Sequence, residues 1–195
     1  THSCLNWMLE THGYPQRYDL AAYREIFGFP IERYYIRAGF DFQRHPYPEL
    51  AARFMEHYNA GVDACPPSRH AADTLAELSR RGWRHSILSA SRRDYLIEQV
   101  AARGLQGFFT ELLGLADIYG VSKVQVGLDY LHRSGLDPAA CVMIGDTTHD
   151  AEVAAALGTR CVLYTGGYQS RARLEAVCGH IIDDLAQLPE LLDTL

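Results

Sequence analysis

Short apolar segments alternate with longer amphipathic ones from residue 70 onward, and this alternation constrains the fold more than any other feature of the sequence. The short segments have the length of buried strands, and the longer ones repeat their apolar residues with the period of a helix. The expected strands are 84–88, 112–114, 141–144, 161–164 and 181–182, and the expected helices are 71–81, 94–102, 124–134 and 150–157. Strands that alternate with helices form a parallel sheet covered by helices on both faces. We therefore predict an α/β fold with a Rossmann-like parallel sheet for residues 67–195.

The first third of the chain shows a different pattern, because every periodic segment there is helical. The expected helices are 4–11, 20–27, 31–38 and 48–60, separated by glycine and proline residues that break helices. The pair Pro66-Pro67 marks the end of this region. We predict a small, all-helical domain over residues 1–66.

Composition limits the partners that this protein can have. The chain has 195 residues, of which 48% are hydrophobic, so it can bury one substantial core and a small additional domain. Its net charge of -6 and the lack of a basic run argue against nucleic acid and anionic membranes as partners. No apolar stretch approaches the ~18 residues of a transmembrane helix. Together with five scattered cysteines, these features favour a cytoplasmic protein in a reducing compartment.

The most informative motif follows the expected strand 141–144, where Gly145-Asp146 leads into a helix that contains Asp150. Ligands of open α/β sheets bind at the carboxyl ends of the strands. Asp146 and Asp150 are one helical turn apart, so both carboxylates can face one pocket, and hard oxygen ligands suit a Mg²⁺ ion that also meets a substrate phosphate. The alternative is that Asp146 only caps the helix and that Asp150 lies on the surface.

Two further sites accompany this acidic loop. The strand 84–88 ends at Ser89-Ala90-Ser91, where the Ser89 hydroxyl and the Ala90 N–H can bind phosphate, unless Ser91 is simply the N-cap of the next helix. Lys123 lies in the first turn of the helix 124–134, where the helix dipole disfavours a cation. A lysine at that position indicates an anionic partner such as a carboxylate or phosphate, although most lysines are solvated surface residues.

Ser89, Lys123 and the Gly-Asp-x-x-x-Asp loop, in this order and spacing, resemble the haloacid dehalogenase-like (HAD) hydrolase superfamily. The stretch 30–35 and the tail 165–170 look most like its phosphoglycolate phosphatase branch. The resemblance implies that the helical domain is a cap inserted over the active site. It also implies catalytic roles for Lys123, Asp146 and Asp150, substrate binding by Ser89, Ala90 and Lys123, and a Mg²⁺ site at Asp146 and Asp150.

One element of the family pattern, a strand that ends in Asp-x-Asp-x-Thr, does not occur in this sequence. In the family its first aspartate is the nucleophile, and the strand lies at the centre of the sheet, between the strands that end at Ser89 and Gly145. Unpaired backbone groups buried at that place would each cost roughly 1–3 kcal/mol. We therefore expect a further N-terminal segment of about ten to twenty residues, a strand with a short lead-in.

The resemblance implies Mg²⁺-dependent hydrolysis of a small phosphorylated metabolite, with phosphoglycolate as the model substrate, through an aspartyl-phosphate intermediate. Three alternatives remain open: a metal-independent dehalogenase, a phosphoglucomutase-like isomerase, and a phosphate-binding or interaction protein without catalysis. The oligomeric state, monomer or homodimer, is also open. The cap carries aromatic and basic residues that can reach substrate or simply pack, and periodicity does not separate the two roles: Tyr14, Tyr23, Arg33, Tyr34, Tyr35, Arg37 and Arg44.

Overall fold

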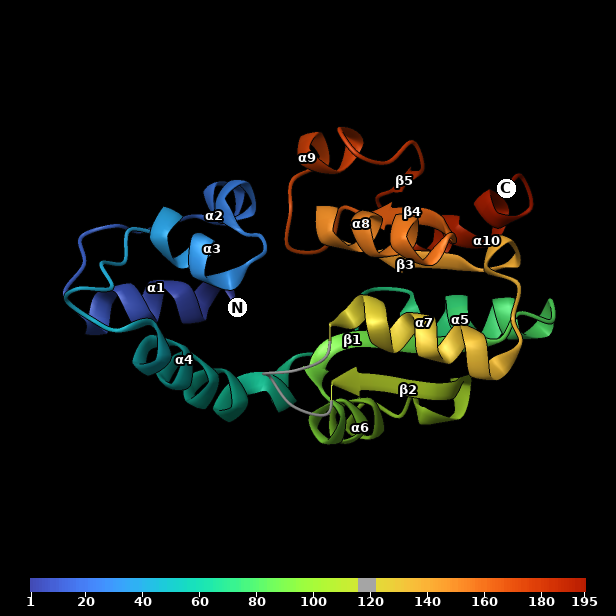
Figure 1. Ribbon diagram of the computed structural model, residues 1–195, viewed down its shortest axis with the longest axis horizontal. Helices are drawn as coiled ribbons and strands as arrows, with labels where there is room; N and C mark the ends of the chain where they lie inside the picture. The colour runs from blue at the N-terminus through green and yellow to red at the C-terminus, as the bar shows by residue number, and fades with distance from the viewer. Residues whose placement is uncertain (116–121) are drawn as a thin grey trace.

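The computed structural model describes residues 1–115 and 122–195, except for the side chain of Asp63. The helical region contains α1 (His2–Thr11), α2 (Leu20–Ile26), α3 (Ile31–Arg37), α4 (Tyr47–Gly61) and a short 3-10 helix, η1 (Val62–Ala64). Figure 1 shows these elements at one end of the molecule, in blue and teal. The predicted boundary near residue 66 lies in the segment between η1 and the next helix, which begins at Ala71.

A single aromatic and aliphatic core holds the cap helices together. Leu5, Met8 and Leu9 lie on one face of α1 at helical spacing and are fully buried. They pack with Leu50 of α4 and with a set of rings from α2, α3 and the segments between the helices. Those buried aromatic residues are Tyr14, Tyr23, Phe27, Tyr34, Tyr35 and Phe40. Five partly buried aromatic residues pack against this core: Trp7, Tyr18, Phe42, Tyr47 and Phe54.

The α/β region alternates helices and strands as predicted. Its strands are β1 (His85–Arg92), β2 (Phe109–Leu115), β3 (Val142–Gly145), β4 (Arg160–Tyr164) and β5 (Ile181–Ile182). Its α-helices are α5 (Ala71–Arg80), α6 (Arg93–Ala102), α7 (Lys123–Ser134), α8 (Thr148–Leu157), α9 (Arg171–Glu175) and α10 (Leu188–Leu192). Short 3-10 helices cover Gln106–Phe108, Pro138–Ala140 and Leu185–Gln187. All described strand pairs are parallel, as the prediction required.

These strands form two separate sheets in the part of the chain that the structure describes. One sheet has the order β1-β2, and the other has the order β3-β4-β5. Figure 1 shows the two sheets one above the other, with α7 in front of the smaller sheet and α8 in front of the larger one. The edges that face each other belong to β1 and β3, the two strands between which the family resemblance places the central strand.

A cleft of about 730 Å³ separates the two sheets, and its lining is mainly apolar. Ile87 and Leu88 of β1 line one side, and Val142, Met143 and Ile144 of β3 line the other. Ile144 is 38% exposed, whereas Val162 of the neighbouring β4 is completely buried. Strands of parallel sheets are normally buried on both faces. Ile144 of β3 is therefore more exposed than is usual for a side chain in a strand of a parallel sheet.

Several boundaries differ from the predicted ones. Helix α8 begins at Thr148 rather than residue 150, because Thr147 is its N-cap. Strand β1 continues to Arg92, with an irregular register after Leu88. Helices α9 and α10 were not predicted, since five residues are too short to show a helical period. Within the described ranges, no helix is both long and apolar enough to cross a membrane.

Candidate active site

The acidic loop between β3 and α8 is fixed by a capping box. The hydroxyl of Thr147 accepts a hydrogen bond from the Asp150 N–H, and Asp150 Oδ2 accepts bonds from the Thr147 N–H and hydroxyl. Asp150 Oδ2 also accepts the Asp146 N–H at 3.1 Å. The interpretation of Asp146 as the cap is therefore wrong, because Thr147 has that role. Asp150 is not a surface residue either, since it is only 7% exposed.

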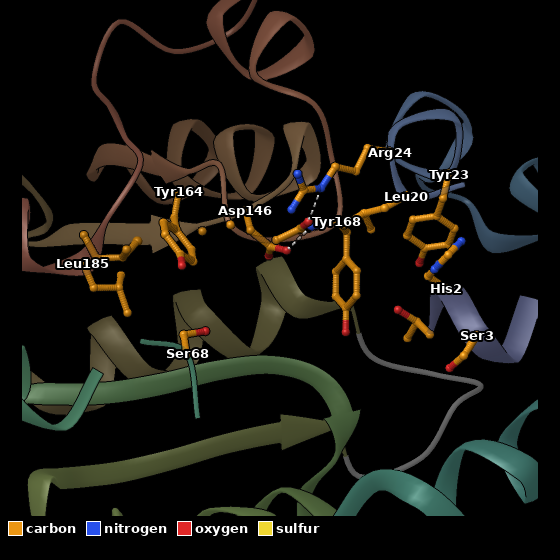
Figure 2. A pocket seen from close by; sticks show the side chains of 15 residues that line it. His2, Ser3, Leu20, Tyr23, Arg24, Ser68, Asp146, Tyr164, Tyr168 and Leu185 are labelled. Carbon is orange, nitrogen blue, oxygen red and sulfur yellow. Dashed lines mark hydrogen bonds between the residues drawn. The ribbon is translucent and has the colours of Figure 1, made fainter. Parts of the chain in front are cut away.

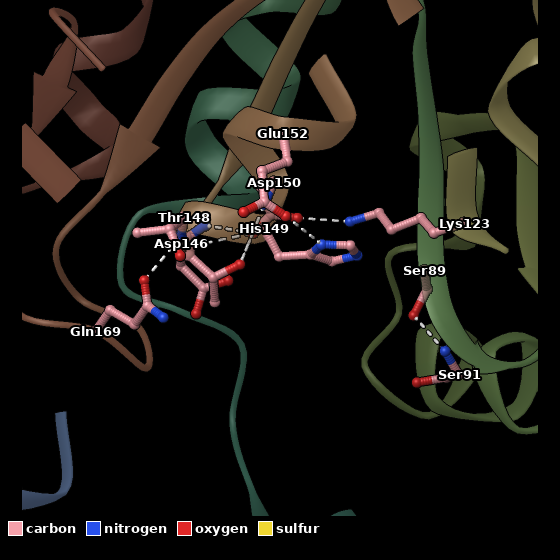
Figure 3. A network of polar contacts seen from close by, with 10 residues as sticks. Ser89, Ser91, Lys123, Asp146, Thr148, His149, Asp150, Glu152 and Gln169 are labelled. Atoms are coloured by element: carbon pink, nitrogen blue, oxygen red, sulfur yellow. Dashed lines mark hydrogen bonds and ion pairs between the residues drawn. The ribbon is translucent and has the colours of Figure 1, made fainter. Parts of the chain in front are cut away.

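Lys123 makes the ion pair that its position at a helix N-terminus indicated. Its Nζ donates to Asp150 Oδ1 at 2.5 Å, and both side chains are nearly buried. Burial by itself would raise the pKa of Asp150, but the Lys123 charge and the hydrogen bonds to Asp150 outweigh it and hold that pKa below its usual value. The prediction of a carboxylate partner for Lys123 is confirmed. Figure 3 shows this pair beside the acidic loop.

Asp146 lies in the same loop but has a different environment. Its Oδ2 accepts the Tyr168 N–H at 2.9 Å, while its Oδ1 has no hydrogen-bond partner within residues 1–115 and 122–195. Burial raises the pKa of Asp146, the Tyr168 N–H opposes that rise, and the charge of Asp150 adds to it. A carboxylate whose charge is penalised by burial, and which has an oxygen to spare, is suited to a cation.

The residues present fit a magnesium ion that keeps several waters. The described residues contain no cluster of three His, Cys, Asp or Glu side chains that could hold a metal without other ligands. Mg²⁺ is usually bound by one or two carboxylates together with waters and substrate phosphates. Asp146 can supply such a ligand. Both oxygens of Asp150 are already hydrogen-bonded within the protein, and this favours its role as the partner that positions Lys123.

Two glycines after β4 allow the chain to pass close to this site. A Cβ added to Gly167 would lie 2.0 Å from Asp146 Oδ2, and one added to Gly166 would lie 2.1 Å from the Tyr164 ring. Contacts that short do not occur, so a larger residue at either position would displace the Asp146 carboxylate or the Tyr164 ring. The Gly166-Gly167 turn is required here by its close approach to the acidic loop and to Tyr164.

Ser89 and Ala90 lie on β1, across from the acidic loop. Ser89 Oγ accepts the Ser91 N–H at 3.0 Å, and Figure 3 places Ser89 on the same side as Lys123. In the described part of the chain, Ser89 makes no hydrogen bond to Lys123, Asp146 or Asp150. The alternative that Ser91 caps the next helix is wrong, because the N-cap is Arg92. Phosphate binding by Ser89 and Ala90 stays a prediction.

A pocket of about 650 Å³ opens beside Asp146 and is shared by the cap and the α/β region (Figure 2). The α/β region contributes Asp146, Gly167 and Tyr168, among others. The cap side consists of Thr1, His2, Ser3, Leu20, Tyr23 and Arg24. Of the aromatic and basic cap residues named from the sequence, Tyr23 lines this pocket.

The pocket also contains cap residues that sequence reasoning missed. Arg24 follows Tyr23 on α2, and its Nε donates to the Gly167 carbonyl at 3.0 Å. His2 lies in the first turn of α1, and its Nε2 is 2.7 Å from the Tyr18 carbonyl. The helical period shows that α2 has a buried face, but it does not show which residues of α2 contact the α/β region, so it could not identify Arg24. The neighbouring Tyr23 was the only signal for Arg24.

Comparison with known proteins identifies the family. A family model described as haloacid dehalogenase-like hydrolase matches residues 1–164. A phosphoglycolate phosphatase of Synechococcus elongatus is 30% identical over 135 residues, which are 67% of this chain and 63% of that protein. A phosphoglycolate phosphatase of Haemophilus influenzae is 27% identical over 74% of this chain and 66% of its own length. The chain thus spans slightly less than two thirds of these relatives.

A solved structure from Streptococcus pneumoniae, described as a haloacid dehalogenase-like family hydrolase, superposes with a TM-score of 0.82. It is 20% identical, and the match covers 98% of this chain and 89% of the other. A predicted phosphatase from Clostridium acetobutylicum gives the same TM-score at 16% identity. These two likenesses establish the fold. With the family match over most of its length, the chain belongs to the haloacid dehalogenase-like hydrolases.

Proposed function

We propose that this chain supplies the cap and most of the active site of a Mg²⁺-dependent phosphatase that hydrolyses a small phosphate monoester. The observation that carries the proposal is the acidic loop. There, among residues 1–115 and 122–195, one Asp146 oxygen has no hydrogen-bond partner and lies beside the Lys123–Asp150 ion pair. A cation ligand and a buried cation at one strand end can together stabilise a phosphoryl group. The names of the matched relatives support the same class of reaction.

Each residue has a separate part in this proposal. Lys123 offsets the negative charge of the nucleophile and phosphate, and Asp150 holds its ammonium group in place. Ser89 and the Ala90 N–H donate to phosphoryl oxygens. Asp146 holds the Mg²⁺ ion, which when bound neutralises charge on the phosphate. Phosphoryl transfer depends mainly on positioning and charge neutralisation, so each of these groups contributes to the rate.

The nucleophile in this proposal is an aspartate on a strand that fills the cleft between β1 and β3. Two observations support such a strand: the cleft has an apolar lining, and within residues 1–115 and 122–195 neither β1 nor β3 has a partner strand at its edge toward the cleft. A strand parallel to both neighbours would place its carboxyl end beside Asp146 and Lys123, at the edge of the sheet where ligands bind. The aspartate attacks phosphorus and releases the alcohol, and water then releases phosphate and restores the carboxylate.

A peptide complementation experiment tests this proposal. A synthetic peptide with about five apolar residues followed by Asp-x-Asp-x-Thr has the usual length of a strand. Added to the chain with Mg²⁺, it should raise the thermal midpoint and produce phosphate release from a small monoester. A matched peptide with asparagine at the first aspartate should raise the midpoint equally and give no turnover. If neither peptide raised the thermal midpoint, and the aspartate peptide gave no phosphate release, the proposal would be contradicted.

The same assay separates the alternatives. Activity that persists in EDTA would indicate a metal-independent hydrolase such as a dehalogenase. Return of the phosphoryl group to the organic product, with no free phosphate, would indicate a mutase. Stabilisation by the aspartate peptide and by inorganic phosphate, without turnover of any monoester, would indicate a phosphate-binding protein.

The substrate that we propose carries a second anionic group, as phosphoglycolate does. Arg24 lines the cap side of the pocket, and its described partner is a backbone carbonyl rather than a carboxylate. Its remaining guanidinium N–H groups can bind a carboxylate in a bidentate way. Replacing Arg24 with glutamine should raise the KM for 2-phosphoglycolate at least tenfold. It should change the KM for glycerol phosphate, a monoester without a second anionic group, much less. A similar rise for both substrates would contradict this assignment.

We also propose a cytoplasmic location, on the composition alone.

A further inference from the structure

Three consecutive residues after β4, Gly167, Tyr168 and Gln169, contact both the cap and the acidic loop, and we call them the strap. Toward the cap, the Gly167 carbonyl accepts from Arg24 Nε, and the Tyr168 ring lies 4.9 Å from the Phe27 ring. Toward the acidic loop, the Tyr168 N–H donates to Asp146 Oδ2. Figure 2 shows Arg24, Tyr168 and Asp146 converging at this point.

Gln169 is the strap residue that joins the two sides through a single group. Its side chain is 1% exposed, so both ends of its amide must find partners inside the protein. The Oε1 atom accepts the N–H of Thr148, the first residue of α8, at 2.7 Å. The Nε2 atom donates to the carbonyl of Phe27, just after α2, at 3.1 Å. One planar amide therefore links the helix that follows Asp146 to the cap (Figure 3 shows the Thr148 contact).

Arg173 of α9 strengthens the cap side of this link without touching the acidic loop. Its guanidinium donates to three carbonyls at the end of α2, those of Arg24, Glu25 and Phe27, at 3.0, 3.1 and 2.5 Å. A cation at a helix C-terminus binds carbonyls that have no partner within the helix. Arg173 and Gln169 share the Phe27 carbonyl, so the position of this cap segment fixes the direction of the Gln169 amide.

We infer that Gln169 is a positioning residue that couples docking of the cap to the orientation of the acidic loop, and thereby to cation binding at Asp146. This inference rests on the proposed function and deepens it. If the cap segment moves away, Gln169 Nε2 loses its hydrogen-bond partner. The amide can then rotate, and the hydrogen bond from the Thr148 N–H to Oε1 is weakened. Coupling between two sites is reciprocal, so a cation at Asp146 also favours the docked cap.

Arg173→Met tests the coupling, because it removes cap contacts only. We would measure amide hydrogen exchange of residues 20–29 and 146–151 in the 195-residue chain, and Mg²⁺ binding by calorimetry. The variant should speed exchange in both segments and weaken Mg²⁺ binding by about fivefold, the lower end of typical couplings. Arg171→Met is the matched control. Arg171 lies on the same helix but pairs with Glu175 and Asp183, so both readouts should stay at the parent values.

A second variant separates the two ends of the Gln169 amide. Gln169→Glu keeps an oxygen for the Thr148 N–H, at a helix N-terminus where negative charge is favourable. It replaces the donor to Phe27 with an acceptor, so it should speed exchange in residues 20–29 as Arg173→Met does. Exchange of residues 146–151 in this variant measures whether the charged carboxylate keeps the Thr148 contact once the contact with Phe27 is lost.

The outcomes distinguish this inference from the proposed function. Faster exchange in residues 146–151 of Arg173→Met supports the coupling even if the chain shows no phosphatase activity with any peptide. Faster exchange confined to residues 20–29, with unchanged Mg²⁺ affinity, overturns the coupling even if the phosphatase activity is established.

Discussion

The cap and the α/β region solve the problem of burying apolar residues in different ways. The cap closes one core in which Leu5, Met8, Leu9 and Leu50 are completely buried. The α/β region has two sheets, and the apolar side chains of β1 and β3 remain partly exposed along the cleft between them. The core of the cap is therefore complete within the cap. The stability of the α/β region depends instead on the contacts that join its two halves, the sheet β1-β2 and the sheet β3-β4-β5.

The Lys123–Asp150 pair is the clearest such link. Lys123 begins α7, which packs on β1 and β2, and Asp150 lies in α8, which packs on β3 and β4. Asp150→Ala should therefore have the largest effect on stability, about 3–5 kcal/mol, because it leaves a buried ammonium group unpaired and removes the capping box. Urea unfolding measures this loss. An effect below about 1 kcal/mol would show that the halves are held together by other contacts.

Leu50→Ala tests the cap's independent core. Leu50 is completely buried in α4, so its truncation should cost about 2–5 kcal/mol. The loss should appear in the unfolding of the cap and should be the same with and without a peptide bound in the cleft. A cost that changes with the peptide would contradict the independence of the two cores. Hydrogen exchange of α1 and α4 locates the effect.

Gly167→Ala should lower stability by about 1–3 kcal/mol, the usual cost of overpacking. The added methyl group would collide with the Asp146 carboxylate, so Mg²⁺ affinity should fall as well. Gly107→Ala is the matched control, because an added Cβ there has no atom within 4 Å and, as at Gly167, φ is not positive. Titration calorimetry measures the Mg²⁺ affinity of both variants. An unchanged affinity in Gly167→Ala would contradict the prediction that the added methyl group displaces the Asp146 carboxylate.

Acidification should weaken the link between the halves gradually. The pKa of Asp150 is lowered in the folded protein, so its contribution is complete above the unfolded value of about 3.9 and is lost as pH falls through the lower folded value. Because the pKa of Asp146 is raised in the folded protein, its protonation as the pH falls increases stability, and this occurs at a higher pH than the loss from Asp150. The fall in urea midpoint below pH 4 should be smaller in Asp150→Asn, and an identical fall would exclude Asp150 as its source.

Ile144→Ala should have the smallest effect, below about 1 kcal/mol, because the side chain is already 38% exposed in β3. The same substitution should cost more once a peptide occupies the cleft, because the side chain then becomes buried. Comparing urea midpoints with and without the peptide shows whether the exposure of β3 reflects a missing neighbour in the sheet.

Most of the fold and part of the site followed from the sequence. The helices and strands have strong periodic patterns, and Lys123 was informative because a cation is unfavourable at a helix start. The start of α8 was misplaced, because Thr147 and Asp150 form a capping box whose acidic member was taken for the first helical residue. Arg24 was signalled only by its neighbour Tyr23, and Gln169 only by its place in the tail 165–170. Their contacts depend on how the cap meets the strand ends, which no local pattern encodes.

The edges of β1 and β3 that face the cleft, which have no partner strand among the described residues, also affect the behaviour of this chain in solution. The edges of β1 and β3 each present backbone groups that any extended segment can pair with, and the apolar lining of the cleft would add to such pairing. In a concentrated sample, the nearest source of such a segment is another copy of the chain. Self-association of the 195-residue chain should therefore increase with concentration, and a peptide that fills the cleft should suppress it.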